Sequence, residues 1–255
     1  MARDGDDRLA SISLFAAQTD FSEAGEITRF ISPSQLSFLE KLMWRRGYLG
    51  SENMGGAFSA LRSSDLIYAG MVERYLMGKK ASLNDLMSWN ADGTRMPYRM
   101  HTEYLEQLYL HNQLATNRFK LGGRTISISD IRVPMFVLGT ETDHVAPWRS
   151  VYKIHHLNGG EITFALTSGG HNAGVVSGPE HPRRRYRVHT HQPGDKYIDP
   201  EEWLEQMEPQ PGSWWPLWDK WLDARMSTRV APPTLGASRK GLKPLCDAPG
   251  TYVFG

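Results

Sequence analysis

Two side chains capable of acid–base chemistry follow two apolar runs of the sequence. Asp143 lies in a polar loop after the run 133–138, and His171 follows the run 162–166 and a Ser-Gly-Gly turn. The carboxyl ends of neighbouring parallel strands meet at one edge of a sheet, so we expect the two side chains to lie close together. A carboxylate can orient an imidazole, and the oriented imidazole can take up and return a proton. The pair therefore predicts the acid and base of a catalytic triad.

The elements that must position this pair read as strand, helix and strand. The run 133–138 breaks at Gly139 into the loop that carries Asp143, and Pro147 can open the next helix because its missing N–H is not needed there. Alternation of buried strands and helices is typical of a parallel α/β sheet. An acidic residue followed by a histidine is the order of the second half of an α/β-hydrolase triad.

The nucleophile of such a triad would lie on a sharp strand-to-helix turn of the form G-x-S-x-G, or with Cys in place of Ser. No serine of the chain has glycine at both flanking second positions. Cys246 has Pro244 and Ala248 there and lies after the histidine in a proline-rich stretch. We therefore expect the nucleophile elbow to precede Met1, with the run 9–17 as the strand that follows the elbow helix.

Composition excludes several classes of protein. The chain of 255 residues has a net charge of +1 and 22% charged residues, which gives no reason to expect nucleic acid or a polybasic membrane contact. No apolar run approaches the roughly 18 residues of a membrane span, so none is predicted. A single cysteine fits a reducing compartment, and we expect a cytoplasmic protein.

The chain divides into four predicted parts. Residues 1–21 are a core strand, 22–122 a mostly helical cap, 123–226 the hydrolase core with the acid and base loops, and 227–255 a Pro/Gly-rich tail. The fold expected is thus an incomplete α/β-hydrolase, the second half of its core sheet, with an inserted cap subdomain. Within the cap, Ser34 is expected to cap a helix that runs to Gly47, and further helices are expected at 52–61, 65–77, 84–89 and 96–114. An ordinary helical layer of the same domain is the alternative to a cap.

Other motifs are weaker. The tryptophan-rich stretch 203–225 predicts a helix with one aromatic face packed against the body of the protein. The charge run 181–185 is expected to be a solvated loop. Two histidine pairs, His155-His156 and His189-x-His191, lack a third ligand at useful spacing, so no metal site is predicted.

Several segments carry a resemblance to a known family. The chain resembles the carboxyl-terminal part of class I poly(3-hydroxyalkanoate) synthases, also called poly(3-hydroxybutyrate) polymerases. The segments that carry the resemblance are DFSEAGEI (20–27), LRSSDLIY (61–68), WNADGTRMP (89–97), ETDHVAPWRSVYK (141–153), SGGHNAGVV (168–176) and GSWWPLWDKWL (212–222).

The resemblance implies a function and a set of site residues. In that family a cysteine on a lipase-like elbow takes the 3-hydroxyacyl group from coenzyme A as a thioester, and the polyester grows by acyl transfer. By match, Asp143 and His171 resemble the catalytic pair, His144 belongs to the same motif, and Trp89 resembles the aromatic residue near the substrate channel. The coenzyme A thioester is the substrate and no cofactor is implied. A polyhydroxyalkanoate granule and a homodimer of the full enzyme are the implied partners.

Without its nucleophile we expect the chain to be inactive alone. Two other functions stay open from the sequence. One is a related esterase or depolymerase with the same hydrolase core, also cut short. The other is a non-catalytic protein that keeps the fold to bind polymer granules or a full-length synthase.

Overall fold

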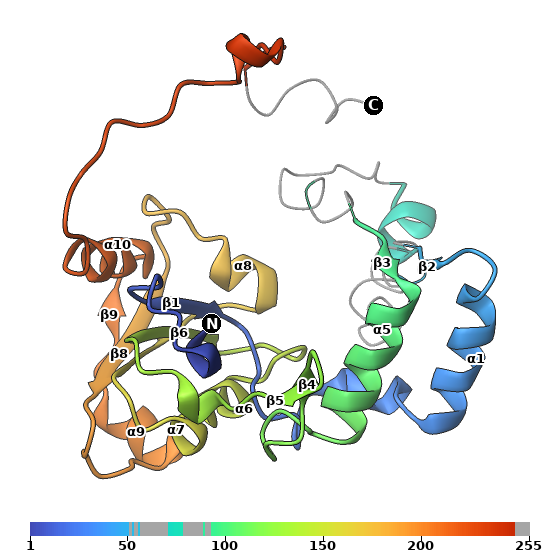
Figure 1. Ribbon diagram of the computed structural model, residues 1–255, viewed down its shortest axis with the longest axis horizontal. Coiled ribbons are helices and arrows are strands. Elements are labelled where there is room, and N and C mark those ends of the chain that lie inside the picture. Colours follow the sequence, from blue (N-terminus) through green and yellow to red (C-terminus); the bar gives the residue numbers. More distant parts are fainter. Residues whose placement is uncertain (51–52, 54–55, 57–70, 79–88, 90–92, 248–255) are drawn as a thin grey trace.

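A mixed sheet forms the body of the protein (Figure 1). The computed structural model describes the chain except residues 51–52, 54–55, 57–70, 79–88, 90–92 and 248–255. Within the described residues the main sheet has five strands in the order β1-β6-β7-β8-β9. Their bounds are β1 Ile12–Phe15, β6 Met135–Thr140, β7 Ile162–Thr167, β8 Arg185–His191 and β9 Gln210–Pro211.

The centre of this sheet is parallel. Ile12 of β1 pairs with Met135 of β6, and Met135 pairs with Ile162 of β7, whereas β8 and β9 run antiparallel. Every residue of β6 and β7 is buried, which explains their continuous apolar sequence. The strands predicted at 133–138, 162–166 and 9–17 are confirmed, with the first extended to Thr140 and the last confined to Ile12–Phe15. The architecture is α/β and compatible with an α/β-hydrolase fold.

Helices cover both faces of the sheet (Figure 1). On one face, Val137 and Phe164 pack in a cluster with Trp148 and Trp203. The helices of that face are α6 Trp148–Tyr152, α7 Ile154–Leu157 and α9 Pro200–Gln206. On the other face, Phe136 packs against α10 Trp215–Asp223, as part of a cluster with Leu138, Ala165, Trp214 and Trp221.

The predicted packing of the tryptophan face of α10 is confirmed. Trp221 and Trp214 are buried, and each indole N–H of this group donates to a group of the body. The four bonds are Trp214 to Gly174 O at 3.1 Å, Trp215 to Val175 O at 2.9 Å, Trp218 to Ser13 Oγ at 2.9 Å and Trp221 to Thr163 Oγ1 at 3.0 Å. The aromatic face thus supplies both apolar area and satisfied donors.

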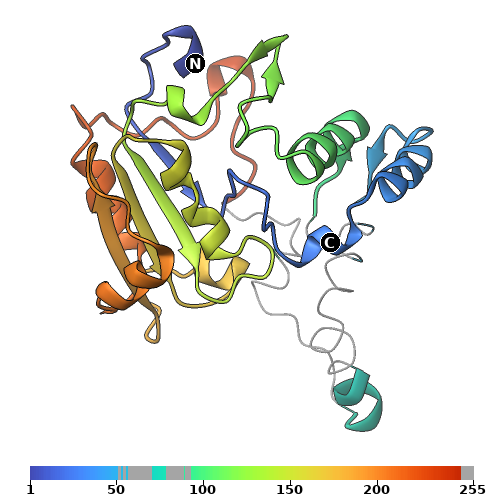
Figure 2. The same ribbon diagram turned by 90° about the horizontal axis from the view of Figure 1, so that it is seen from below.

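The segment between β1 and β6 stands beside the sheet (Figures 1 and 2). Its described elements are η2 Glu26–Phe30, α1 Pro33–Met43, β2 Tyr48–Leu49, η4 Val72–Leu76, β3 Met96–Pro97, α5 Tyr98–Tyr104, η5 Leu105–Leu110, β4 Lys120–Leu121, β5 Arg124–Thr125 and η6 Ile128–Asp130. The predicted helix at 96–114 is seen as α5 followed by the π-helical η5. The helices predicted at 52–61, 65–77 and 84–89 lie largely outside the described residues.

The start and end predicted for α1 were wrong. Ser32, not Ser34, accepts the hydrogen bond from Gln35 N, because Pro33 occupies the first helical position and so places the cap one residue before it. The helix ends at Met43, and the chain then turns at Gly47 with a φ of +74°.

The last described part, residues 227–247, extends away from the sheet (Figure 1). It is exposed throughout and contains one 3₁₀ turn, η7 Ser238–Lys240. None of the described helices is both long enough and apolar enough to cross a lipid bilayer.

Candidate active site

The loops after β6 and β7 meet at the carboxyl edge of the sheet, as the sequence predicts. Two backbone bonds join them: Glu141 N donates to Thr167 O at 2.9 Å, and Thr142 N donates to Gly169 O at 3.1 Å. His171 is the first residue of α8 His171–Val175, directly after this junction. Its Nδ1 lies 2.8 Å from Oδ2 of Asp143, so the structure brings the predicted acid and base together.

Asp143 is held as a carboxylate. Its side chain is fully buried, and Oδ1 accepts from Val145 N and from Ala146 N, each at 2.8 Å. Thr140 Oγ1 donates to Oδ2 at 3.2 Å. Burial alone would raise the pKa of Asp143, but the hydrogen bonds from His171 and the two backbone amides outweigh it and hold this pKa below the usual value.

The charge of Asp143 decides the tautomer of the histidine. An ionised carboxylate can only accept, so Nδ1 of His171 carries the proton and Nε2 of the neutral ring keeps its lone pair. This is the arrangement in which an imidazole accepts a proton from a nucleophile while the carboxylate stabilises the resulting imidazolium. Among the described residues, no side chain forms a hydrogen bond with Nε2 of His171.

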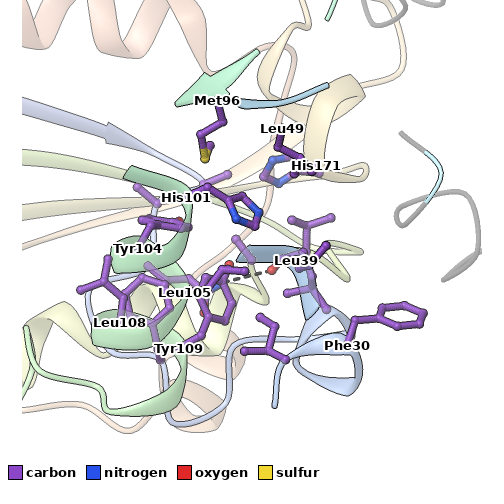
Figure 3. A pocket seen from close by; sticks show the side chains of 18 of the residues that line it. Phe30, Leu39, Leu49, Met96, His101, Tyr104, Leu105, Leu108, Tyr109 and His171 are labelled. Atoms are coloured by element: carbon purple, nitrogen blue, oxygen red, sulfur yellow. Dashed lines mark hydrogen bonds between the residues drawn. The ribbon is translucent and has the colours of Figure 1, made fainter. Parts of the chain in front are cut away.

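His171 opens onto a cavity of about 540 Å³ (Figure 3). The cavity lies between the body and the segment that precedes β6: Val145 and Ala146 line it from the Asp143 loop, and α5 and η5 line it from the other side. Its walls are mainly apolar and aromatic, with Phe21, Ile27, Phe30, Ile31, Leu39, Leu49, Met96, Leu105, Leu108 and Tyr109 among them. Such a space suits an aliphatic chain with a few polar groups.

Arg184 fixes the histidine loop, and its role was missed. The run 181–185 was predicted to be a solvated loop, which is wrong for this residue. Its guanidinium donates to Ser168 O at 3.0 Å, Ala173 O at 2.7 Å and Ser177 Oγ at 2.7 Å, on both sides of His171. Gly169, with a φ of +107°, leaves the room that this guanidinium fills. The only signal in the sequence was a cluster of arginines, and nothing in it distinguishes the half-buried Arg184 from its neighbours.

Side-chain contacts also hold the loop that carries Asp143 and the helix α8 in place. Arg185 and Arg187 donate to the carboxylate of Glu141, at 2.7 and 3.1 Å. Gly174 packs so closely on Thr140 that a Cβ there would lie 2.7 Å from Cγ2 of the threonine. Thr140 also bonds to Asp143, so the packing of α8 and the placement of the acid are linked.

The family resemblance implies that His144 and Trp89 contact substrate, and this stays a prediction. The carbonyl of His144 accepts from Glu26 N at 3.1 Å, which ties the acid loop to the segment before β6. Gly25 adopts a φ of +80° at this contact, and a Cβ there would lie 2.6 Å from His144 O. The side chain of Trp89 is 56% exposed. Neither residue is among the described residues that line the cavity.

Cys246, the only cysteine of the sequence, is exposed in the stretch 227–247. The pairs His155-His156 and His189-x-His191 lie away from His171, on α7 and on β8. Burial lowers the pKa of His155 to about 4. Within the described residues, no group of three or more His, Cys, Asp or Glu side chains could hold a metal ion.

This chain is similar along nearly its whole length to several known proteins. No family model matches it. It is 39% identical over 253 residues to the poly(3-hydroxyalkanoate) polymerase subunit PhaC of Rhizobium etli, and 38% identical over 252 residues to the poly(3-hydroxyalkanoate) polymerase of Methylorubrum extorquens. The subunit PhaC of Cupriavidus necator is 30% identical over 261 aligned positions. Each match covers 99% of this chain but only 39%, 41% and 43% of the respective relative. The chain is therefore homologous to the carboxyl-terminal part of poly(3-hydroxyalkanoate) polymerases.

Proposed function

We propose that this chain supplies the acid and base of a polyhydroxyalkanoate polymerase site, and that the nucleophilic cysteine comes from residues outside the 255 of this sequence. One observation carries the proposal: the Asp143–His171 pair opens onto an apolar cavity in a chain homologous to such polymerases. In this proposal, Nε2 of His171 accepts the proton of that cysteine's thiol.

The proposed reaction has two acyl transfers. Nε2 of His171 takes the proton of the cysteine thiol, and the thiolate attacks the thioester carbonyl of a 3-hydroxyacyl-CoA. Coenzyme A leaves as a thiol with the proton from His171, and the acyl group stays on the cysteine. His171 then takes the proton of a hydroxyl group at the end of the growing chain or of the next monomer, and that oxygen attacks the acyl-cysteine to form an ester. The bond between the acyl group and the cysteine sulfur breaks, and the cysteine regains its proton from His171. Asp143 stabilises the imidazolium in both transfers.

The surroundings of the site have proposed roles of their own. Residues 22–122 form the cap, and the cavity beneath them receives the acyl chain. His144 and Trp89 contact other parts of the substrate, outside the cavity. The coenzyme A thioester is the substrate, so the reaction uses no cofactor. We place the complete enzyme in the cytoplasm, as a homodimer at the surface of the polyester granule.

A chimera tests the proposal. Residues 1–255 replace the matched 39% of the Rhizobium etli relative, and coenzyme A release and polymer are measured with 3-hydroxybutyryl-CoA. We expect polymer from the chimera and none after His171→Gln, whereas the exposed His111→Gln leaves the rate unchanged. Polymer made at the same rate by the His171→Gln chimera would contradict the proposal. Release of free 3-hydroxybutyrate in place of polymer would indicate a hydrolase.

A further inference from the structure

A second histidine projects into the cavity, and it has a nitrogen without a partner. His101, on α5, is only 7% exposed, and its Nδ1 is buried with no hydrogen bond from or to the residues that the structure describes. Burial lowers the pKa of His101, so the ring is neutral near pH 7. A buried polar atom that protein groups leave unpaired is costly, so this nitrogen in a residue of the cavity wall calls for a partner.

Gln18 and His171, two other polar residues of the cavity wall, are already hydrogen-bonded or serve the reaction. The amide of Gln18 is used on both sides: Nε2 donates to Val145 O at 3.0 Å, and Oε1 accepts from Ser150 Oγ at 3.0 Å. Tyr109 packs its ring on Phe21 at a centroid distance of 4.8 Å. His171 carries the proton chemistry. Figure 3 shows the rings of His101 and His171 both directed into the cavity, from α5 and from α8.

We propose that His101 binds the 3-hydroxyl group of the acyl chain in this cavity and so selects 3-hydroxyacyl groups over unsubstituted ones. The inference rests on the proposed function, and it names the residue that recognises the substrate there. Apolar walls suit the aliphatic part of the chain, and one ring nitrogen suits its one hydroxyl. A hydroxyl both donates and accepts, so it satisfies Nδ1 in either tautomer of His101.

The expected effect is discrimination by a single hydrogen bond. An acyl group without the hydroxyl would leave Nδ1 of His101 buried and without a hydrogen bond. A hydrogen bond of this kind, with the desolvation of its partner, corresponds to about 10-fold in affinity. Sites built around a hydroxyl reject analogues that lack it for this reason.

The test is binding to the 255-residue chain, which needs no turnover. Methyl (R)-3-hydroxybutanoate and methyl butanoate are titrated into protein labelled with ¹⁵N at histidine, and the ring nitrogen signals of His101 are followed by NMR. We expect the hydroxy ester to bind about 10-fold more tightly and to shift the Nδ1 signal of His101. Methyl butanoate should bind in the cavity without that shift.

Three variants sharpen the test. His101→Phe keeps a ring but removes the nitrogen, and should bind both esters equally. His101→Asn keeps a polar group near the position of Nδ1 and should retain part of the preference. His111→Phe is the matched control, since His111 is exposed and follows η5 on the same helical segment. It should behave as the wild type.

The outcomes separate this inference from the proposed function. A hydroxyl preference that survives in His101→Phe, or equal binding of both esters by the wild type, overturns the role of His101 and leaves the acid–base pair untouched. Failure of both esters to bind overturns the role of His101 and the acyl cavity together, whereas the chimera still tests His171. The Nδ1 signal of the wild type gives an answer even if a variant fails to fold.

Discussion

At the scale of single residues, four hydrogen bonds fix the position of the Asp143 carboxylate. Three donors besides His171 surround its carboxylate: two backbone amides and the hydroxyl of Thr140. These bonds fix which oxygen faces the imidazole, so the orientation of His171 is set before any substrate binds. Preorganisation of this kind is what lets an acid–base pair act without rearrangement.

The first prediction concerns Asp143→Asn. The amide would present a donor or a weaker acceptor to Nδ1 of His171, so the ring would lose the tautomer that leaves Nε2 free. In the chimera we expect coenzyme A release to fall about 10³- to 10⁴-fold, the size seen when a triad carboxylate is neutralised. Asp219→Asn, at an exposed position of α10, is the control and should keep full activity. An Asp143→Asn chimera within tenfold of the wild type would disprove the role of the carboxylate.

The second prediction concerns acid unfolding. Because the folded state holds the pKa of Asp143 below its value of 3.8 in an unfolded chain, this carboxylate stabilises the fold above that pH. The contribution is lost as pH falls through the lowered folded pKa. We expect the difference in free energy of unfolding between wild type and Asp143→Asn to be at its full size above about pH 5 and to shrink below about pH 4. Urea unfolding at several pH values measures it, and a difference that grows toward acid pH would contradict the sign.

At the scale of elements, the histidine loop depends on side chains far along the sequence. Arg184 bonds to carbonyls before and after His171, while Trp214 and Trp215 bond to the carbonyls of Gly174 and Val175 in α8. A helix of five residues has little stability of its own, so its position is set by these contacts.

The third prediction tests Arg184. Arg184→Ala removes three hydrogen bonds, those to Ser168 O, Ala173 O and Ser177 Oγ, and Ala173 O then keeps the bond from the hydroxyl of Ser177. We expect the free energy of unfolding to fall by about 2–4 kcal/mol. Amide exchange over residues 168–177 should become faster. Arg183→Ala, at the exposed neighbouring position, should change neither measurement. If both variants unfold at the same urea concentration as the wild type, Arg184 does not hold the loop.

The sequence predicted β6, β7 and the Asp143–His171 pair because these features leave local patterns. Strands buried on both faces read as apolar runs, and the pair follows the ends of those runs. Arg184 was missed because two of its three partners are backbone carbonyls, which have no sequence signature. Ser32 and Ser34 both suit a helix cap, and only the position of Pro33 separates them. His101 was missed because a buried histidine on a helix gives no sign of an unpaired nitrogen.

At the scale of the whole molecule, the cavity joins two parts that are distant in the sequence. Residues of α1, α5 and η5 face Ala16, Ala17 and the Asp143 loop of the body across it. The stretch after β1 also contacts the end of the helical segment before β6, because the side-chain carbonyl of Asn112 accepts from Phe21 N at 3.0 Å. Under the proposed function, the length of acyl chain that fits is therefore set jointly by the helices and by the sheet, and neither part determines it alone.

The last prediction tests this shared control of chain length. Leu39 of α1 lines the cavity, and Leu39→Trp would fill part of its 540 Å³. We expect binding of methyl (R)-3-hydroxyoctanoate to weaken about 10-fold or more, because each methylene that loses burial costs about 0.8 kcal/mol. Methyl (R)-3-hydroxybutanoate needs less of the space and should lose at most a few-fold. Phe38→Trp adds a similar ring at the adjacent, 65% exposed position and should change neither affinity. Equal weakening of both esters by Leu39→Trp would instead mean that the acyl chain does not extend toward α1.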